Sequence, residues 1–89
     1  MEQGDQVKAL IWQMVCSVVD TPSGVTVEAT NENGLTRYRV RVEDKEVGQV
    51  IGKQGRTARA IRTILAAIAM KEKRRLELDI VTSSGSLSA

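Results

Sequence analysis

The sequence predicts one α+β domain with the element order α-β-β-α-α-β, in which three helices cover one face of a three-stranded mixed sheet. Two long segments repeat apolar residues at helical spacing, shorter segments alternate apolar and polar residues, and glycines interrupt the second helical region. The 89 residues suffice for one domain with one core. That core must be aliphatic, because the aromatic residues are Trp12 and Tyr38 alone.

A first helix is expected from Asp5, whose side chain suits an N-cap, to about Asp20. Pro22 ends the helix, because proline disfavours helical backbone in the residue before it. The buried stripe has the i, i+3, i+4, i+7 spacing of an amphipathic helix and consists of Val7, Leu10, Ile11, Met14, Val15 and Val18.

A β-hairpin is expected next. Residues 25–30 and 37–42 alternate apolar and polar side chains, and Asn33-Gly34 between them is a strong hairpin signal. The inward side chains of the second strand are Tyr38, Val40 and Val42. Opposite charges across strands stabilise a sheet modestly, so the outer face is interpreted as a compensated solvent face rather than a binding surface. Its members are Arg37, Arg39, Arg41, Glu28, Glu77 and Asp79.

The second half of the chain predicts two helices and a strand. Asp44 is expected to cap a short helix that reaches Ile51. A longer helix follows from about Arg56 to Lys71, with a buried stripe of Ala58, Ile61, Ile64, Leu65 and Ile68. The last strand, residues 75–81, follows a two-helix crossover and should pair in parallel with its neighbour, with Leu76, Leu78 and Ile80 inward. The domain then spans residues 5–81, between flexible ends at residues 1–4 and 82–89.

Charge is distributed unevenly along the chain. Residues 45–75 contain nine basic and two acidic residues, a net charge of +7, whereas the remainder contains four basic and nine acidic residues, a net charge of −5. One interpretation is a localised surface that binds a polyanion. The other is a solvated helix face with ordinary surface charge, and charge alone leaves both open.

The residue inventory argues against catalysis. Histidine is absent, no cluster resembles a metal site, and Cys16 lies near the apolar stripe of the first helix, where a packed thiol is the expected role. Three residues rather than four separate Gly48 from Gly52, and Gln54 follows Lys53, so the phosphate-loop pattern of nucleotide hydrolases fails. The dinucleotide fingerprint fails too. We therefore expect no enzyme, cofactor, metal or small-molecule substrate.

The chain reads as a cytoplasmic protein without a membrane partner. Its start, residues 1–5, is acidic rather than basic, unlike a signal peptide. Its longest apolar run is far shorter than the roughly 20 residues that a membrane span needs.

The most informative stretch is Gly52-Lys53-Gln54-Gly55, between two helical segments. Glycine accepts positive φ and lacks a Cβ, so the backbone there can approach a ligand closely. The N–H groups at the start of the following helix favour anions. The alternative is a plain turn between helices with a C-cap glycine.

This stretch carries a family resemblance. The run from Val50 to Gly55, followed by Ala58 and Ile61, resembles the core signature of a KH domain, and the element order is that of the type II variant. The extended run Gly-Lys-Gln-Gly-Arg-Thr-Ala in a chain of this size is similar to the KhpA family of small bacterial KH proteins.

The resemblance implies a non-catalytic protein that holds about four nucleotides of single-stranded RNA, with the loop on the sugar-phosphate backbone. Bases would lie in a groove between the two helices and a strand edge. The implied RNA-binding residues are Gly52, Lys53, Gln54 and Gly55, with Arg56 and Arg59 as a positive rim and Val50, Ile51 and Ile61 as an aliphatic floor. The alternative for the last three residues is core packing alone.

The resemblance also implies RNA chaperone or post-transcriptional activity linked to cell-wall synthesis and cell length. Its implied partners are a second copy, forming a homodimer, or a larger Jag/KhpB-type RNA-binding protein. Trp12, Cys16 and Val19 form a second apolar stripe at i, i+4, i+7 of the first helix, where a partner could pack. That stripe equally fits a helix that is buried more widely. An alternative function is therefore a dimerisation or adaptor subunit of a larger RNA-binding complex.

Overall fold

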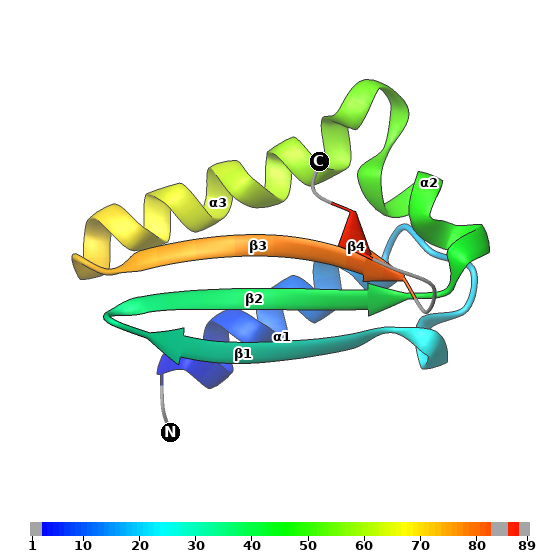
Figure 1. The fold of residues 1–89 in the computed structure, drawn as a ribbon. Coiled ribbons are helices and arrows are strands. Elements are labelled where there is room, and N and C mark those ends of the chain that lie inside the picture. Colours follow the sequence, from blue (N-terminus) through cyan, green and yellow to red (C-terminus); the bar gives the residue numbers. More distant parts are fainter. Residues whose placement is uncertain (1–2, 83–85, 88–89) are drawn as a thin grey trace.

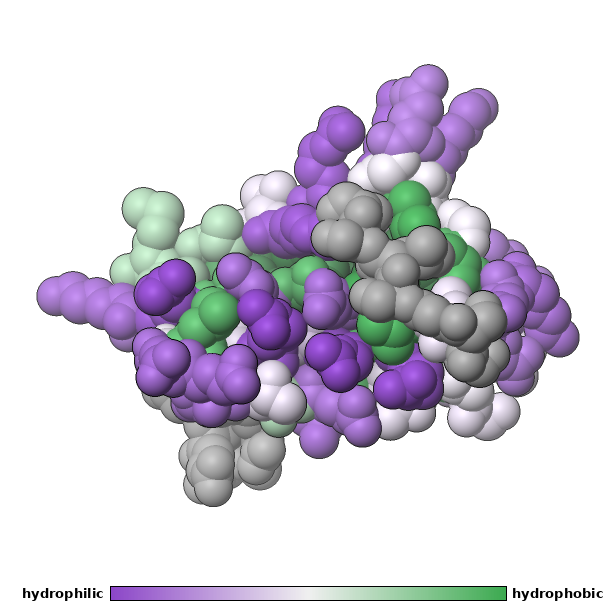
Figure 2. All heavy atoms as spheres, viewed as in Figure 1, coloured by the Kyte–Doolittle hydropathy of each residue, from purple (hydrophilic) through white to green (hydrophobic). Residues whose placement is uncertain are grey.

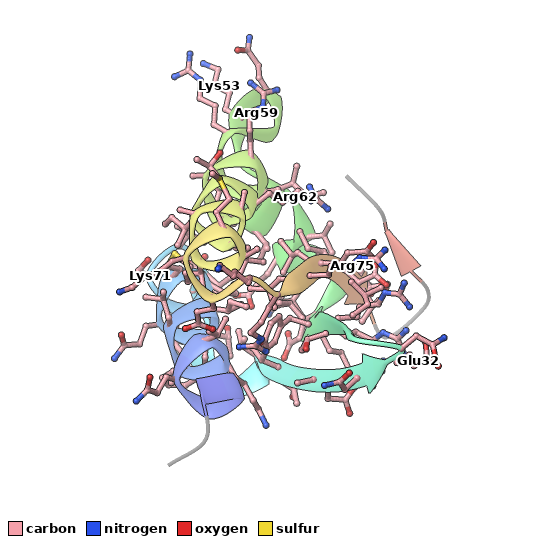
Figure 3. The ribbon with its side chains drawn as sticks, turned by 90° about the vertical axis from the view of Figure 1, so that its left-hand side faces the viewer. Glu32, Lys53, Arg59, Arg62, Lys71 and Arg75 are labelled. Carbon is pink, nitrogen blue, oxygen red and sulfur yellow. The ribbon has the colours of Figure 1, made fainter. Side chains whose placement is uncertain are left out.

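The computed structural model describes residues 3–82 and 86–87, and it confirms the predicted order α-β-β-α-α-β. Figures 1 and 3 show α1 and α3 on the same face of the sheet, and within the described residues no helix covers the opposite face. Short 3₁₀ turns lie at Pro22–Gly24, Asp44–Glu46 and Lys53–Gly55. The elements are α1 (Gln3–Cys16), β1 (Thr26–Glu32), β2 (Leu35–Val42), α2 (Val47–Ile51), α3 (Arg56–Glu72), β3 (Arg75–Thr82) and β4 (Ser86–Leu87).

The sheet is mixed, with the strand order β1-β2-β3-β4. β1 and β2 pair antiparallel up to Glu32 opposite Leu35, which leaves Asn33 and Gly34 as a two-residue turn. Both have positive φ, 53° and 80°, as the hairpin signal requires. β3 pairs parallel with β2, as the crossover predicts.

The short strand β4 is an addition to the predicted three-stranded sheet. It pairs antiparallel with β3, with Ile80 opposite Leu87 and Val81 opposite Ser86. The stretch 82–89, expected to be a flexible end, therefore includes the last residue of β3 and a further strand, while residues 83–85 and 88–89 lie outside the described residues.

An aliphatic core fills the space between helices and sheet. The predicted inward residues of β2, namely Tyr38, Val40 and Val42, are all buried, and Tyr38 is the aromatic side chain at its centre. The same cluster contains Val7, Ile11, Val15, Val25, Val27, Val50, Ala58, Ile61, Leu65, Leu78 and Ile80. Burial of apolar surface on this scale is the main favourable term in folding.

Helix α1 differs from its predicted bounds. It begins at Gln3, so Asp5 lies inside the helix rather than at its N-cap, and it ends at Cys16 rather than near Asp20. The early end has a tertiary cause. The backbone N–H groups of Asp20 and Thr21 donate to Oε2 of Glu46, over 3.0 and 2.8 Å, instead of to helical carbonyls.

The regions around α2 and α3 require two more corrections. Asp44 opens a 3₁₀ turn, and α2 itself begins at Val47 without a side-chain cap bond. In α3, Ile64 is 38% exposed, whereas Ala58, Ile61 and Leu65 are buried. Ile64 therefore lies at the exposed flank of the buried stripe.

The outer face of the sheet is a compensated charged surface, as predicted. Arg37 Nη2 lies 3.0 Å from Glu77 Oε1, and Arg39 Nη2 lies 4.0 Å from Asp79 Oδ2, each pair in register across β2 and β3. The Glu77 carboxylate raises the pKa of Arg37. Figure 2 shows hydrophilic residues spread over this face. Exposed pairs of this kind contribute little stability but leave few unpaired charges for a ligand.

Candidate nucleic-acid interface

The loop between α2 and α3 is built from backbone conformations that favour glycine. Gly52 has φ 83° and ψ 165°, Gln54 has φ 59°, and Gly55 has φ 74°. The N–H of Gly52 donates to the carbonyl of Gly48 over 2.8 Å, and the N–H of Gly55 donates to the carbonyl of Gly52 over 3.0 Å. These bonds fix a compact reversal between the two helices.

Gly52 and Gly55 require glycine for different physical reasons. A Cβ at Gly52 would lie 2.4 Å from Oγ1 of Thr57 and 2.7 Å from its backbone nitrogen, so the first turn of α3 leaves no room for a side chain. A Cβ at Gly55 would meet open space, and only its positive φ favours glycine. Gly52 therefore lets the loop lie directly against α3, while Gly55 lets the chain enter that helix.

The loop presents cations to solvent. Lys53, Arg56 and Arg59 are exposed, as is Gln54, and we call the three cations the tip cluster. Figure 3 shows Lys53 and Arg59 at the outer end of the molecule, away from the sheet. Residues 47–71 contain no acidic side chain, so this end of the molecule carries a positive potential next to the N-terminus of α3.

The +7 charge of residues 45–75 does not form one surface. Figure 3 shows Lys71 and Arg75 well away from Lys53, at the other end of α3. There, Arg74 donates to Glu72 over 2.8 Å, and this ion pair raises the pKa of Arg74 and compensates its charge. Arg74 also donates to Thr36 over 3.3 Å. Only the tip cluster belongs to the loop.

The predicted aliphatic floor is mostly inside the core. Val50 is 0% and Ile61 is 2% exposed, so neither side chain can touch a base in this conformation, and the alternative of core packing is favoured for both. Ile51 is half-buried beside the loop and is the one member of the three with surface to offer. Val50 and Ile61 instead anchor α2 and α3, and thereby hold the loop.

Sequence reasoning missed one residue near the loop. Arg62, on α3, donates from Nη2 to the carbonyl of Leu78 on β3 over 3.4 Å. Arg56, Arg59 and Arg62 recur every three residues, and this spacing predicts only that they share a solvent-exposed face of the helix. The contact depends on where β3 lies relative to α3, for which the sequence holds no local signal.

The second apolar stripe on α1 is not continuous. Trp12 is 44% exposed and borders a hollow with Lys8, Ala9 and Val27. Cys16 is half-buried, and burial raises the pKa of its thiol. Val19 is buried in the core beyond the end of α1, so it has little surface to offer a partner. Of the three residues, Trp12 offers the clearest exposed surface.

In residues 3–82 and 86–87, no helix is both long and apolar enough to cross a membrane. In the same residues, no three acidic, cysteine or histidine side chains come together where they could hold a metal ion.

A helix–Gly-x-x-Gly–helix unit packed on a mixed sheet, in the order α-β-β-α-α-β, defines a type II KH domain. The comparison with known families agrees, since residues 8–80 match the family described as KhpA/KhpB, KH domain. The chain belongs to this family.

Curated relatives share most of their length with this chain. A protein of Halalkalibacterium halodurans is 39% identical over 74 residues, covering 83% of this chain and 97% of the relative. One of Oceanobacillus iheyensis is 42% identical over 74 residues, covering 83% and 99%. One of Borreliella burgdorferi is 40% identical over 80 residues, covering 90% and 96%. Each of the three is named RNA-binding protein KhpA.

Proposed function

We propose that this chain is a non-catalytic single-stranded RNA-binding protein that clamps the RNA backbone at Gly52–Gly55. The observation that carries the proposal is the loop itself, a glycine-dependent reversal pressed onto the start of α3 and bordered by the tip cluster. The names of the relatives support RNA as the ligand.

The chemistry of the clamp follows from its parts. The bare backbone at Gly52 and Gly55 lets a sugar-phosphate chain approach within hydrogen-bonding distance of the loop. Lys53, Arg56 and Arg59 then neutralise neighbouring phosphates. Ile51 is the apolar contact available to a base, and no aromatic side chain lies in residues 45–75 for stacking. Binding should therefore depend on charge and shape, with little selectivity among bases.

The test replaces Lys53 and Gln54 together with Asp. Both side chains are exposed, and Asp tolerates the left-handed backbone at position 54, so the fold should persist. RNA affinity should fall by about tenfold or more, because two carboxylates would face the phosphates. Fluorescence anisotropy with a labelled oligouridine measures the affinity, and circular dichroism checks the fold.

A matched control carries the same change in net charge elsewhere. Lys73→Asp with Ser23→Asp alters two exposed residues outside the loop, and Lys73 lies at the opposite end of α3. This control should keep RNA affinity within about twofold at moderate salt, where charges beyond the Debye length are screened. If the folded loop variant binds as tightly as the parent, the loop is not the clamp.

A specific observation favours a second candidate, a protein-interaction subunit. On the outer side of α3, Ala60, Ile64 and Ala67 form an exposed row, and Met70 nearby is 81% exposed. Small residues in such a row allow another helix to approach closely. The occupant would be a second copy of this chain or a Jag/KhpB-type RNA-binding protein, and two linked clamps would raise avidity for RNA.

Analytical ultracentrifugation tests this second candidate. Ile64→Glu places a charge in the exposed row and should convert dimers to monomers, while Ala66→Glu, off the row on the same helix, should not. Trp12→Ala tests the alternative surface on α1. A parent that stays monomeric at high concentration and recovers no partner would exclude the interaction role.

We also place the RNA-binding activity in RNA chaperoning or post-transcriptional control linked to cell-wall synthesis and cell length. This part of the proposal depends on the family resemblance. Replacing the chromosomal copy with the Lys53→Asp, Gln54→Asp variant should then change cell length as deletion does. Normal cell length in that strain, beside altered length in the deletion, would separate the cellular role from RNA binding.

A further inference from the structure

The edge of β3 that faces away from β2 is occupied by the chain's own C-terminal segment. β2 pairs with one edge of β3, and β4 pairs with the other, with Ile80 opposite Leu87 and Val81 opposite Ser86. An open strand edge is a template for an extended partner, since its N–H and C=O groups seek hydrogen bonds. β4 lies beyond residues 8–80, the part that matches the family.

This edge is also the one next to α3. Arg62 reaches from α3 to the carbonyl of Leu78, and we infer from this contact that the carbonyl points away from β2. Alternate residues of a strand direct their backbone groups to the same edge, so Ile80 shares this edge with Leu78. Figure 1 shows β4 on the side of β3 nearer α3, and Figure 3 shows Arg62 pointing from α3 toward that region.

We propose that β4 is an internal competitor of RNA, which holds the β3 edge of the groove closed until a nucleic-acid strand displaces it. The inference rests on the proposed function and concerns the regulation of the same site. A strand clamped by Gly52–Gly55 would place its bases between α3 and the β3 edge. In this structure, Arg62 engages that edge at Leu78 and β4 engages it at Ile80 and Val81.

The competitor has the strength that a reversible block requires. Only three residues separate Thr82 from Ser86, so closing the connection costs little entropy. The paired segment is only two residues long, however, so it can contribute only one or two hydrogen bonds. Their net stabilisation gives a ratio of paired to released β4 of only about two to ten. Apparent RNA affinity is reduced by the open fraction, so releasing β4 should tighten binding by about two- to tenfold.

The segment can be removed without damage to the core. Every member of the buried cluster described above lies between Val7 and Ile80. A chain that ends at Thr82 should therefore keep its fold. Leu87→Pro is a subtler variant, because Leu87 lies opposite Ile80 and proline has no N–H to donate to β3. Ser86→Pro is its matched control, since the N–H of the neighbouring residue points away from β3.

The experiment measures the affinity of a fluorescein-labelled oligouridine for these four chains at one salt concentration, together with NMR spectra of the full chain with and without RNA. The truncated chain and Leu87→Pro should bind about two- to tenfold more tightly than the parent, and Ser86→Pro should match the parent. RNA should also move the Ser86 and Leu87 signals of the full chain to random-coil positions.

Equal, measurable affinities for all four chains would overturn the competition while leaving the RNA clamp intact. Weaker binding by the truncated chain would also overturn it, because β4 would then be part of the RNA site. Absence of RNA binding by every chain, truncated and full, is the different signature expected if the proposed function itself is wrong, and the competition would fall with it.

Discussion

At the scale of single residues, the loop depends on Gly52 more than on any of its cations. The backbone there occupies a region that is essentially restricted to glycine, and the first turn of α3 fills the space where a Cβ would stand. Gly55, by contrast, faces open space. The two glycines of one motif thus carry unequal constraints, which the sequence alone does not distinguish.

This inequality gives a prediction for the two alanine variants. Gly52→Ala should lower the free energy of unfolding by about 3 kcal/mol or more, since it adds both backbone strain and overlap with the Thr57 nitrogen. Gly55→Ala should cost only about 1–2 kcal/mol, the strain of a left-handed non-glycine residue. Urea titration measures both, and similar losses for the two variants would contradict the proposed role of Thr57.

At the scale of elements, α2 is too short to be stable alone and depends on its neighbours. It has 5 residues, and isolated helices of that length do not persist in water. Val50 fixes it to the core, and two side chains tie its start to the loop after α1. Glu46 accepts the N–H groups of Asp20 and Thr21, while Gln49 donates to Asp20 over 3.3 Å.

Glu46 should therefore be the most sensitive polar residue of this region. It is 2% exposed, and its Oε1 has no hydrogen-bond partner among the described residues, so Oε2 alone holds the two N–H groups. Glu46→Ala should destabilise the protein by about 2 kcal/mol, because it leaves two partly buried donors without their acceptor. Glu46→Gln keeps an acceptor oxygen and should lose less than half of that. Thermal and urea unfolding provide the measurement, and equal losses would show that charge rather than acceptor geometry matters.

Elements that depend on local residues could be predicted from the sequence, and those that depend on distant residues could not. The hairpin turn at Asn33-Gly34 and the alternation of β2 are local, so their residues alone predicted them correctly. In β1 only Val27 is buried, so the alternation predicted for that strand does not extend beyond Val27. The end of α1 at Cys16, the exposure of Ile64 and the contact of Arg62 with Leu78 depend on neighbours that are distant in sequence. At the candidate site, the two glycines correctly predicted a loop whose backbone has positive φ. The burial of Val50 and Ile61 could not be predicted, because it depends on how the helices pack against the sheet.

At the scale of the whole molecule, charged side chains lie in three regions, which differ in whether their cations form ion pairs with carboxylates. The outer sheet face pairs Arg37 and Arg39 with carboxylates, and the far end of α3 pairs Arg74 with Glu72. For the tip cluster, the structure shows no ion pair among the described residues. Electrostatic attraction for RNA at the loop should therefore arise from the tip cluster.

Salt dependence of RNA binding tests this division. Three cations that neutralise phosphates of a single strand predict a slope of log affinity against log salt of about −2. Arg59→Gln should reduce the steepness by about 0.7, the contribution of one phosphate contact to a single strand. Arg39→Gln, on the sheet face, should leave the slope unchanged. An equal change for the two variants would indicate diffuse attraction by net charge instead of a defined clamp.

Because Trp12 is partly exposed, its intrinsic fluorescence can report on binding at the surface of α1. Trp12 is the single tryptophan of the chain, and it lies on α1 beside β1 rather than at the loop. Because indole emission shifts to the blue when water is removed from the ring, a partner that covers α1 would change the intrinsic fluorescence. A ligand bound only at Gly52–Gly55 would leave that emission unaltered. The emission wavelength of Trp12, measured without any label, can thus distinguish protein association at this surface from RNA binding at the loop.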